Sequence, residues 1–357
     1  MCESFPEVDV LLVCSSSTHG HRRREGEMIA ALRGLGLSVA ETNPDYRSVS
    51  WLQFTMPLID LSQALVMRRA TTRACRELRP RALIYATSVA AILEPQSRLR
   101  KGAICYDALI RENRLGWRGL IQRLLEVRSL RSSRMLMPLA LTGVPGREDL
   151  VEYPLLMPIA PSGPPADGHG TDVVCYAGDP GKKGLDTMID AWALLEAEGR
   201  LLWVAGIDEE VAKRFLARRG VSVPGSVRWL GSVPPTEFRA IVRGAAAYLA
   251  ASRYEDYGIA QLEALADGTP LVTTPSRGPF EALGILRELA PELVAEANTA
   301  QALSTSLQNV LDWDGDTRSR FRSSIATRMV DYSLEAMRRR LGEILPVLLS
   351  ESRGHPS

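Results

Sequence analysis

The sequence predicts an α/β protein made of two domains, each with a parallel β-sheet covered by helices. Short apolar runs, typical of buried strands, alternate with helical stretches from residue 8 onward and again from residue 172. The segment Tyr153–Thr171 between them is rich in Pro and Gly and keeps neither periodicity, so it reads as a linker. A chain of 357 residues is long enough for two domains of ordinary size. The two halves therefore read as Rossmann-like units.

The first half, residues 1–153, opens with a strand, a polar loop over Ser15–Gly26 and a helix over Glu27–Arg33. Further helices are expected within Trp51–Arg79 and over Gly116–Ser133. The strands expected in this half are Val8–Cys14, Leu37–Ala40, Ala82–Ala86, Lys101–Tyr106 and Arg134–Leu141.

The second half, residues 172–330, follows a linker over residues 154–171. Its expected strands are Asp172–Gly178, Arg200–Ala205, Ser226–Leu230, Ala247–Ala251 and Pro270–Thr274. Its expected helices are Leu185–Glu196, Glu209–Arg219, Thr236–Arg243, Ile259–Ala266 and Thr299–Leu311, with one or two more inside Thr317–Leu349.

Composition favours a soluble protein of a reducing cytoplasm. Hydrophobic residues make up 45% and charged residues 24% of the chain. The five cysteines form no Cys-x-x-Cys, and Cys14, Cys105 and Cys175 lie in apolar runs that predict buried thiols. We expect no signal peptide and no membrane-spanning segment. The net charge of +1 conceals a mild basic excess in the first half, carried by Arg, which does not support nucleic-acid binding.

The stretch Ala250–Thr274 carries the most informative motif. A strand end leads into a short loop with Glu255 and Gly258, and the predicted helix that follows contains Glu263. The free N–H groups and positive dipole end of a helix N-terminus suit a phosphate. Two carboxylates at different heights along the axis could hold two hydroxyl groups of one elongated ligand.

The pattern Ser-x-x-Glu-x-x-Gly-x-x-x-x-Glu-Ala-x-Ala-x-Gly-x-Pro-x-Val resembles the donor-sugar motif of retaining glycosyltransferases with the two-Rossmann B-type fold, the large family four. The resemblance implies two Rossmann-like domains facing across a cleft. It also implies that Glu255 contacts the donor sugar and Glu263 the ribose, while Tyr257 and the amides of Gly258 and Ile259 lie near the donor diphosphate. The alternative is a βαβ unit whose glutamates only solvate a helix.

The segment after the first strand of the second half, Gly178–Gly184, resembles the family's Gly-Arg-x-x-x-Lys-Gly. The resemblance places Gly178, Lys182 and Lys183 at the donor, with Lys183 stabilising the departing diphosphate, against the alternative of a solvated turn. Asp179 replaces the family's Arg, and its charge is expected to turn away or to pair with Lys182.

Three more positions of the second half follow from the resemblance. Ser232 and Val233 come after a strand where the family's loop backbone meets the nucleobase. Arg277 replaces a Gly in a Gly-Gly-x-x-Glu turn and could restore the positive charge missing at Asp179. The resemblance also implies that the C-terminal helix, in residues 331–357, crosses back to the first domain.

The first half offers weaker candidates. His19 and Gly20 occupy the loop that closes over donor phosphates in the family, and a solvated basic loop is the alternative. Asp107 follows a strand and either orients an acceptor hydroxyl or caps a helix, while Tyr106 stands where relatives have a His. The amphipathic helix Gly116–Ser133 could lie on an anionic membrane, but packing against its own sheet is favoured.

These features predict a cytoplasmic hexosyltransferase, with contact to the inner face of the membrane left open. Its catalytic residues would be Glu255, Lys183 and Asp107, its co-substrate a UDP- or GDP-sugar, and its acceptor a sugar, a lipid-linked molecule or a small molecule. No cofactor and no metal are expected, because no Asp-x-Asp stands in the usual place. The alternatives are a nucleotide-sugar-binding protein without turnover and a sugar epimerase of the same fold. A dehydrogenase is disfavoured because neither half shows Gly-x-Gly-x-x-Gly.

Overall fold

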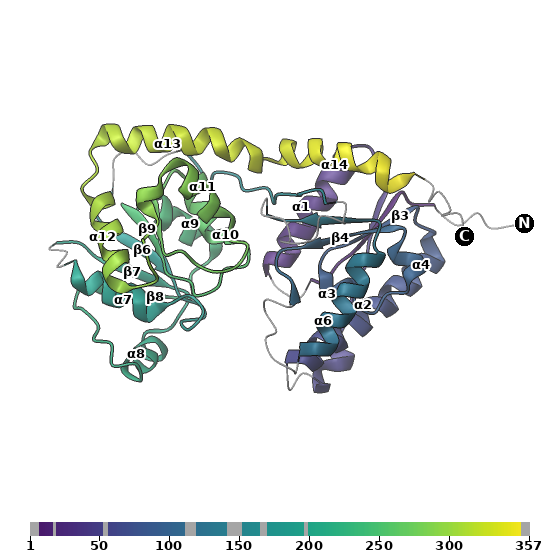
Figure 1. Ribbon diagram of the computed structural model, residues 1–357, viewed down its shortest axis with the longest axis horizontal. Coiled ribbons are helices and arrows are strands. Elements are labelled where there is room, and N and C mark those ends of the chain that lie inside the picture. Colours follow the sequence, from purple (N-terminus) through teal and green to yellow (C-terminus); the bar gives the residue numbers. More distant parts are fainter. Residues whose placement is uncertain are drawn as a thin grey trace, which may run out of the picture. The chain divides into compact units, whose positions relative to one another are not determined.

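The computed structural model describes residues 7–16, 19–52, 56–110, 119–140, 152–164, 170–195 and 199–350. The chain divides into two compact units (Figure 1). Unit 1 comprises residues 1–158 and 331–357, and unit 2 comprises residues 159–330. Each unit holds its own five-stranded parallel sheet, which confirms the predicted α/β fold with two Rossmann-like units.

The sheet of unit 1 has the strand order β2-β1-β3-β4-β5. Its strands are β1 (Val10–Val13), β2 (Val39–Glu41), β3 (Ala82–Tyr85), β4 (Gly102–Tyr106) and β5 (Met135–Pro138). Helices α1 (His19–Gly34) and α14 (Leu334–Leu349) cover one face. The other face packs against α2 (Met56–Leu78), α3 (Ser88–Ala91), α4 (Gln96–Leu99) and α6 (Leu120–Ser132). The strand order reverses between β1 and β3, where open α/β sheets gather ligands beyond the carboxyl ends of their strands.

The sheet of unit 2 has the strand order β10-β9-β6-β7-β8, so its order reverses between β6 and β9. Its strands are β6 (Val173–Tyr176), β7 (Leu202–Ala205), β8 (Val227–Gly231), β9 (Ala247–Ala250) and β10 (Leu271–Thr273). Its helices are α7 (Leu185–Leu194), α8 (Glu209–Ala217), α9 (Pro235–Gly244), α10 (Ile259–Ala266), α11 (Glu281–Leu289), α12 (Ala300–Leu311) and α13 (Gly315–Met329).

Two segments that lie beyond residue 153, the predicted end of the first domain, also pack into the core of unit 1. Met337, Leu341 and Ile344 of α14 are buried in the core on the α1 face of the sheet. Leu155 is also buried in that core, and its N–H donates to the carbonyl oxygen of Pro138 at 2.8 Å. The first residues of the expected linker therefore belong to unit 1, whereas residues 165–169 of that linker lie outside the described part of the chain.

Helix α1 begins at His19, eight residues before the predicted start at Glu27, so the expected polar loop is wrong for most of its length. Tertiary contacts explain the difference. The buried Glu25 carboxylate accepts the backbone N–H groups of Ser15 and Ser16 at 2.6 and 3.1 Å. The buried Arg24 guanidinium donates to the carbonyl oxygen of Ala86, beyond β3. These hydrogen bonds stabilise the polar first turns of α1, which the pattern of apolar residues does not predict.

Helix α6 packs on unit 1, as favoured, but through the opposite face from the one that its apolar spacing predicts. Gln122, Glu126 and Ser129 are buried together with Leu130. Glu126 accepts the backbone N–H of Ile110 at 2.9 Å, and the Ser129 hydroxyl donates to the carbonyl oxygen of Ala91 at 3.0 Å. Because these polar side chains find backbone partners, the helix leaves Leu120, Ile121 and Leu124 exposed. Residues 116–118 of the predicted helix lie outside the described chain.

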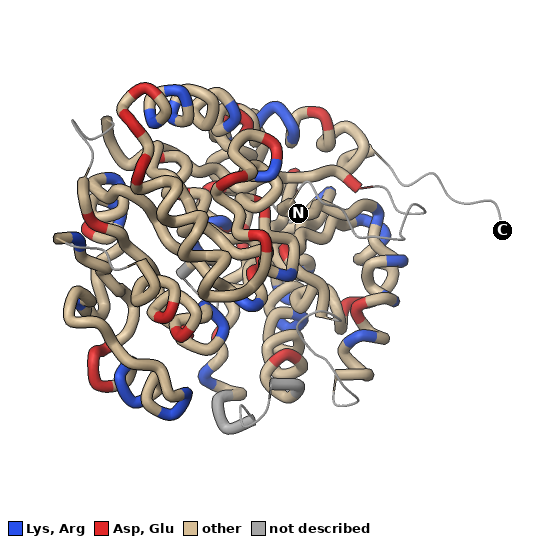
Figure 2. Tube along the Cα trace, turned by 60° about the vertical axis from the view of Figure 1, so that its left-hand side comes forward, with Lys and Arg blue, Asp and Glu red and all other residues tan. Residues whose placement is uncertain are grey.

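The side-chain chemistry agrees with the other compositional expectations. Cys14, Cys105 and Cys175 are buried and free, and burial raises the pKa of Cys105 and Cys175 to about 12. Within the described residues, no helix has the length and hydrophobicity needed to cross a bilayer. Lys and Arg residues are interspersed with Asp and Glu along much of the trace (Figure 2).

Candidate functional site

The candidate site of unit 2 is built by two loops at the point where its strand order reverses. One loop follows β6 and contains Lys182, and the other follows β9 and contains Arg253. The Arg253 N–H donates to the carbonyl oxygen of Lys182 at 2.9 Å. Gly184 has a φ of +67°, and a Cβ there would lie 2.0 Å from the carbonyl oxygen of Ala251. Only glycine therefore lets the two loops approach this closely.

Lys183 and Glu255 meet across these loops. The Lys183 ammonium lies 2.7 Å from Glu255 Oε2. The Ser252 hydroxyl and the Gln261 side-chain amide donate to the same oxygen at 2.7 and 2.9 Å. Glu255 Oε1 accepts no side-chain hydrogen bond from the described residues. The carboxylate is thus oriented by three donors while its second oxygen stays available to a ligand hydroxyl.

The N-terminus of α10 opens beside this pair. Gly258 precedes the helix with a φ of +81°, and no side chain caps its first turn. A Cβ at Gly258 would lie 2.7 Å from a ring carbon of Phe280, so the position requires glycine for space as well as for conformation. Tyr257 is buried and Ile259 is half-buried. Uncapped N–H groups at a helix N-terminus suit a phosphate group.

Glu263 extends from α10 to a buried cation that the sequence did not reveal. Arg239 Nη1 lies 3.1 Å from Glu263 Oε1, and Arg239 Nε and Nη2 each donate to Asp267 at 2.7 Å. Burial alone would lower the pKa of Arg239, but its hydrogen bonds to Asp267 and the negative charges of Glu263 and Asp267 raise that pKa above its ordinary value. In the sequence, Arg239 is marked only by its place next to Phe238 in a predicted helix; both residues are buried in α9.

Of the two arrangements expected for Asp179, the ion pair with the Lys182 side chain does not form, because Lys182 pairs with Asp256 instead. Lys182 Nζ lies 2.6 Å from Asp256 Oδ2 and 5.8 Å from the centre of the Tyr254 ring. The Asp179 carboxylate instead accepts the backbone N–H of Lys182 at 2.9 Å. Asp179 therefore shapes the turn that follows Gly178 and presents Lys183, because short carboxylates readily accept N–H groups from nearby residues of a turn.

The remaining positions of unit 2 lie at the same edge of the sheet. Ser232 is exposed and Val233 half-buried directly after β8. Arg277 has an exposed side chain, and its carbonyl oxygen accepts the backbone N–H of Glu255 at 2.9 Å. The roles in base binding and in charge compensation given to these residues stay predictions.

In unit 1, polar side chains gather at the reversal between β1 and β3. Half-buried Asp107 accepts the N–H of Ala108 at 2.9 Å and lies 3.9 Å from Arg24 Nη1. His21, which the sequence did not single out, has Nδ1 3.0 Å from the Ser15 hydroxyl. Burial and the Arg24 charge lower the pKa of His21.

Three positions of unit 1 that the sequence analysis discussed lie in secondary structure or have a structural partner. Gly20 lies in the first turn of α1 rather than in a loop, and so does His19, whose side chain lies outside the described residues. The Tyr106 hydroxyl donates to Glu152 at 3.0 Å, so this residue has a structural partner where relatives have a His.

Comparison with known proteins identifies the region that holds this site. Residues 165–328 match the family Glycosyl transferases group 1. The chain carries a group 1 glycosyl transferase domain. The match covers the loops of Lys183 and Glu255 and the helices of Arg239 and Glu263, so the geometry described for unit 2 belongs to the glycosyl transferase domain.

Two curated relatives align with parts of the chain. Mannosylfructose-phosphate synthase of Agrobacterium fabrum is 32% identical over 111 residues, which are 28% of this chain and 24% of that protein. The lipopolysaccharide core biosynthesis glycosyltransferase LpsE of Rhizobium meliloti is 29% identical over 139 residues, 39% of this chain and 38% of that protein. The chain thus spans between about a quarter and two fifths of the relatives it matches.

Solved structures resemble almost the whole chain. Sucrose-phosphate synthase of Thermosynechococcus elongatus matches with a TM-score of 0.71 at 14% identity, over 96% of this chain and 99% of that one. A glycosyltransferase of Rickettsia africae matches with a TM-score of 0.65 at 12% identity, over 97% and 100%. At these identities the likeness establishes the fold, the B-type architecture of two Rossmann-like domains.

Substituting alanine for Gly278 is expected to disturb the glycosyl transferase domain locally. Gly278 has a φ of +100°, and a Cβ there would lie 2.2 Å from the carbonyl oxygen of Glu255. We expect a loss of about 1–3 kcal/mol of stability, because the backbone that carries Glu255 must move. Gly284→Ala on α11 is the control, since its Cβ meets nothing within 4 Å. Thermal unfolding compares the two, and equal melting temperatures would contradict this account.

Proposed function

We propose that this chain transfers a hexose from a nucleoside diphosphate donor, a UDP- or GDP-sugar, to an acceptor hydroxyl. The observation that carries the proposal is the Lys183–Glu255 pair beside the uncapped N-terminus of α10. Glu255 Oε1 accepts a hydroxyl of the sugar, Lys183 and the first N–H groups of α10 hold the diphosphate, and Glu263 receives the ribose. Gly178 and Lys182 border the phosphates, and Ser232 and Val233 border the base.

The reaction breaks the bond between the anomeric carbon and the diphosphate oxygen, which takes the electron pair. Lys183 and the helix N-terminus stabilise the charge that develops on the diphosphate, because they are fixed before the reaction begins. The acceptor oxygen bonds to the anomeric carbon and loses its proton. In the retaining course that we propose, a leaving phosphate oxygen takes this proton on the same face of the sugar, and Asp107 of unit 1 orients the acceptor hydroxyl.

We propose that the reaction needs no metal ion. The support is the chemistry of the site, since an ammonium group and a helix N-terminus already supply positive charge where a metal would otherwise stand. No cluster of three or more His, Cys, Asp or Glu side chains suited to a metal occurs among the residues that the structure describes. Activity that persists unchanged in excess chelator is the expected result.

The acceptor that we propose is a sugar, lipid-linked or free, on the cytoplasmic side of the membrane. The names of the two curated relatives favour a carbohydrate acceptor, since one is named for mannosylfructose phosphate and the other for the lipopolysaccharide core. A small-molecule acceptor outside the carbohydrates remains the second choice. The donor experiment that follows does not depend on this assignment.

A panel of UDP-, GDP- and ADP-sugars tests the donor site by thermal unfolding. A ligand at 100 times its dissociation constant adds about 2.7 kcal/mol of stability, which is easily measured. We expect one nucleotide class to stabilise the protein and Glu263→Ala to lose most of that effect, while Gln308→Ala on α12 keeps it. If no nucleotide sugar stabilises the protein at millimolar concentration, the proposed function is wrong. Donor binding without transfer or hydrolysis would favour the binding protein, and release of free sugar without an acceptor would favour the epimerase.

A further inference from the structure

The N-terminal halves of α2 and α6 in unit 1 expose an apolar surface. Leu120, Ile121 and Leu124 of α6 are 50%, 64% and 62% exposed, and Leu58 of α2 is 43% exposed. The partly buried Leu125 packs against the same small core as α2, so the two helix halves lie close together. Leu58, Leu120, Ile121 and Leu124 are called the apolar tip below. The exposure of its three α6 residues follows from the burial of the polar face of that helix.

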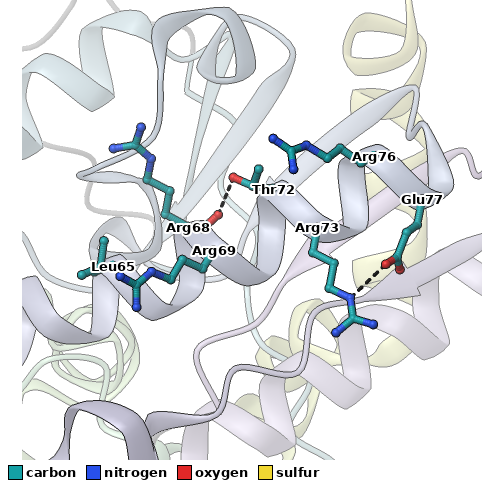
Figure 3. Close-up of a pocket in the computed structure, with 7 residues that line it drawn as sticks. All are labelled: Leu65, Arg68, Arg69, Thr72, Arg73, Arg76 and Glu77. Carbon is teal, nitrogen blue, oxygen red and sulfur yellow. Dashed lines mark hydrogen bonds and ion pairs between the residues drawn. The ribbon is translucent and has the colours of Figure 1, made fainter.

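The C-terminal half of α2 carries a groove of about 370 Å³ lined by arginines (Figure 3). The groove is lined by Leu65, Thr72 and Glu77 together with Arg68, Arg69, Arg73 and Arg76, and these four arginines are called the basic groove. Glu77 is bonded to Arg73 at 2.9 Å. The other acidic residues of α2 and α6, Asp60 and Glu126, are buried. Positive charge therefore dominates the outward side of both helices in the described chain.

The apolar and basic parts follow one another along both helices. On α2, the exposed Leu58 lies seven residues before Leu65 and thus on the same helix face, which continues into the basic groove. On α6, the exposed Leu124 is followed one turn later by half-buried Arg128 and then by exposed Arg131. Both helices cover the same face of a parallel sheet and precede strands of it, so they run in the same direction.

An apolar end followed by arginines matches the profile of a lipid bilayer surface. Leu and Ile side chains insert at the boundary between the lipid headgroups and the acyl chains, while guanidinium groups form bidentate hydrogen bonds with lipid phosphates. A buried protein contact would instead favour few charges at its centre. We propose that the apolar tip and the basic groove dock unit 1 on an anionic lipid bilayer. This surface lies in unit 1, so the proposal does not depend on the donor site of unit 2.

Vesicle flotation of the full chain tests the proposal. The probes are vesicles of phosphatidylcholine alone and of phosphatidylcholine with phosphatidylglycerol, at about 0.1 and 1 M salt. One variant combines Arg69→Gln with Arg76→Gln, and a second combines Leu120→Gln, Ile121→Gln and Leu124→Gln. Both variants change only exposed side chains, so we expect them to fold like the wild type. Their melting temperatures and their nucleotide binding are measured to check that they do. The matched control combines Leu194→Gln and Val211→Gln, two exposed apolar residues of unit 2.

We expect the protein to bind anionic vesicles roughly tenfold or more better than neutral ones at low salt. The arginine variant should lose most of that preference, and the α6 variant should lose binding to both vesicle types, while the control binds like wild type. Absence of vesicle binding, or equal binding by all variants, would overturn the proposal. The proposal would also be overturned if the wild-type protein formed a dimer that the α6 variant abolishes. Binding to single-stranded RNA in place of vesicles would overturn it as well. If the wild-type protein binds no nucleotide sugar, the proposed function is wrong, but the proposal of bilayer docking is unaffected.

Discussion

Replacing Lys183 with glutamine is expected to lower kcat by about 100- to 1,000-fold, the usual cost of removing one preorganised group that stabilises transition-state charge. Lys183 carries three N–H donors and touches Glu255 at 2.7 Å, so it can keep that contact while it reaches a phosphate oxygen. Its loss removes the positive charge at the diphosphate and one of the three donors that orient Glu255. Both effects fall on the bond-breaking step.

The measurement is the rate of nucleotide release over a range of donor concentrations up to saturation, so that kcat and the donor KM are obtained separately. Lys213→Gln on α8 is the control, because Lys213 is exposed and, among the described residues, forms an ion pair only with Glu209, four residues earlier. We expect the control to keep wild-type kcat and the donor KM of Lys183→Gln to rise as well. A Lys183→Gln variant that retains more than about a third of wild-type kcat would assign Lys183 to a structural role.

The features of the fold that are local in sequence could be predicted. Val10–Val13 and Val173–Tyr176 are continuous apolar runs flanked by polar loops, and such runs are typical of buried parallel strands. Helix α10 was predicted with its observed ends because Gly258 and Gly268 bound an apolar stretch. Glu255, Gly258 and Glu263 lie within nine residues of each other, so a pattern could find them together.

The features that depend on distant partners could not be predicted. The polar start of α1 is held by Arg24 and its bond to Ala86, 62 residues away. The buried face of α6 depends on Ser129 reaching Ala91, 38 residues away. Periodicity showed that this helix is amphipathic, but it could not show that the polar side chains Gln122, Glu126 and Ser129 would be the buried ones. Arg239 was missed for the same reason, since Asp267 lies 28 residues further along the chain.

Replacing Arg239 with lysine is expected to weaken the recognition of ribose as well as stability. Arg239 is a positioning residue in this account: it holds Glu263 at 3.1 Å and Asp267 by two bonds of 2.7 Å. Lysine keeps the charge but cannot form the forked contact that joins both carboxylates. We expect a loss of about 3 kcal/mol or more of stability, because a buried ion cluster loses its geometry. A dead or unfolded protein alone would not show that Arg239 acts through Glu263.

The decisive measurement is therefore the ratio of affinities for a nucleoside diphosphate and its 2′- and 3′-deoxy analogues. A site built to bind hydroxyl groups rejects an analogue that lacks them, so wild type should prefer the ribose form by about tenfold or more. Arg239→Lys should bring this ratio close to one, because Glu263 is no longer held in place. Asp267→Asn disturbs the same cluster and the bonds to Ser162, yet leaves the Arg239–Glu263 contact, and it should keep the ratio despite a lower melting temperature. If both variants lose the ratio equally, the effect comes from general loosening of α10, and Arg239 has no specific part in positioning Glu263.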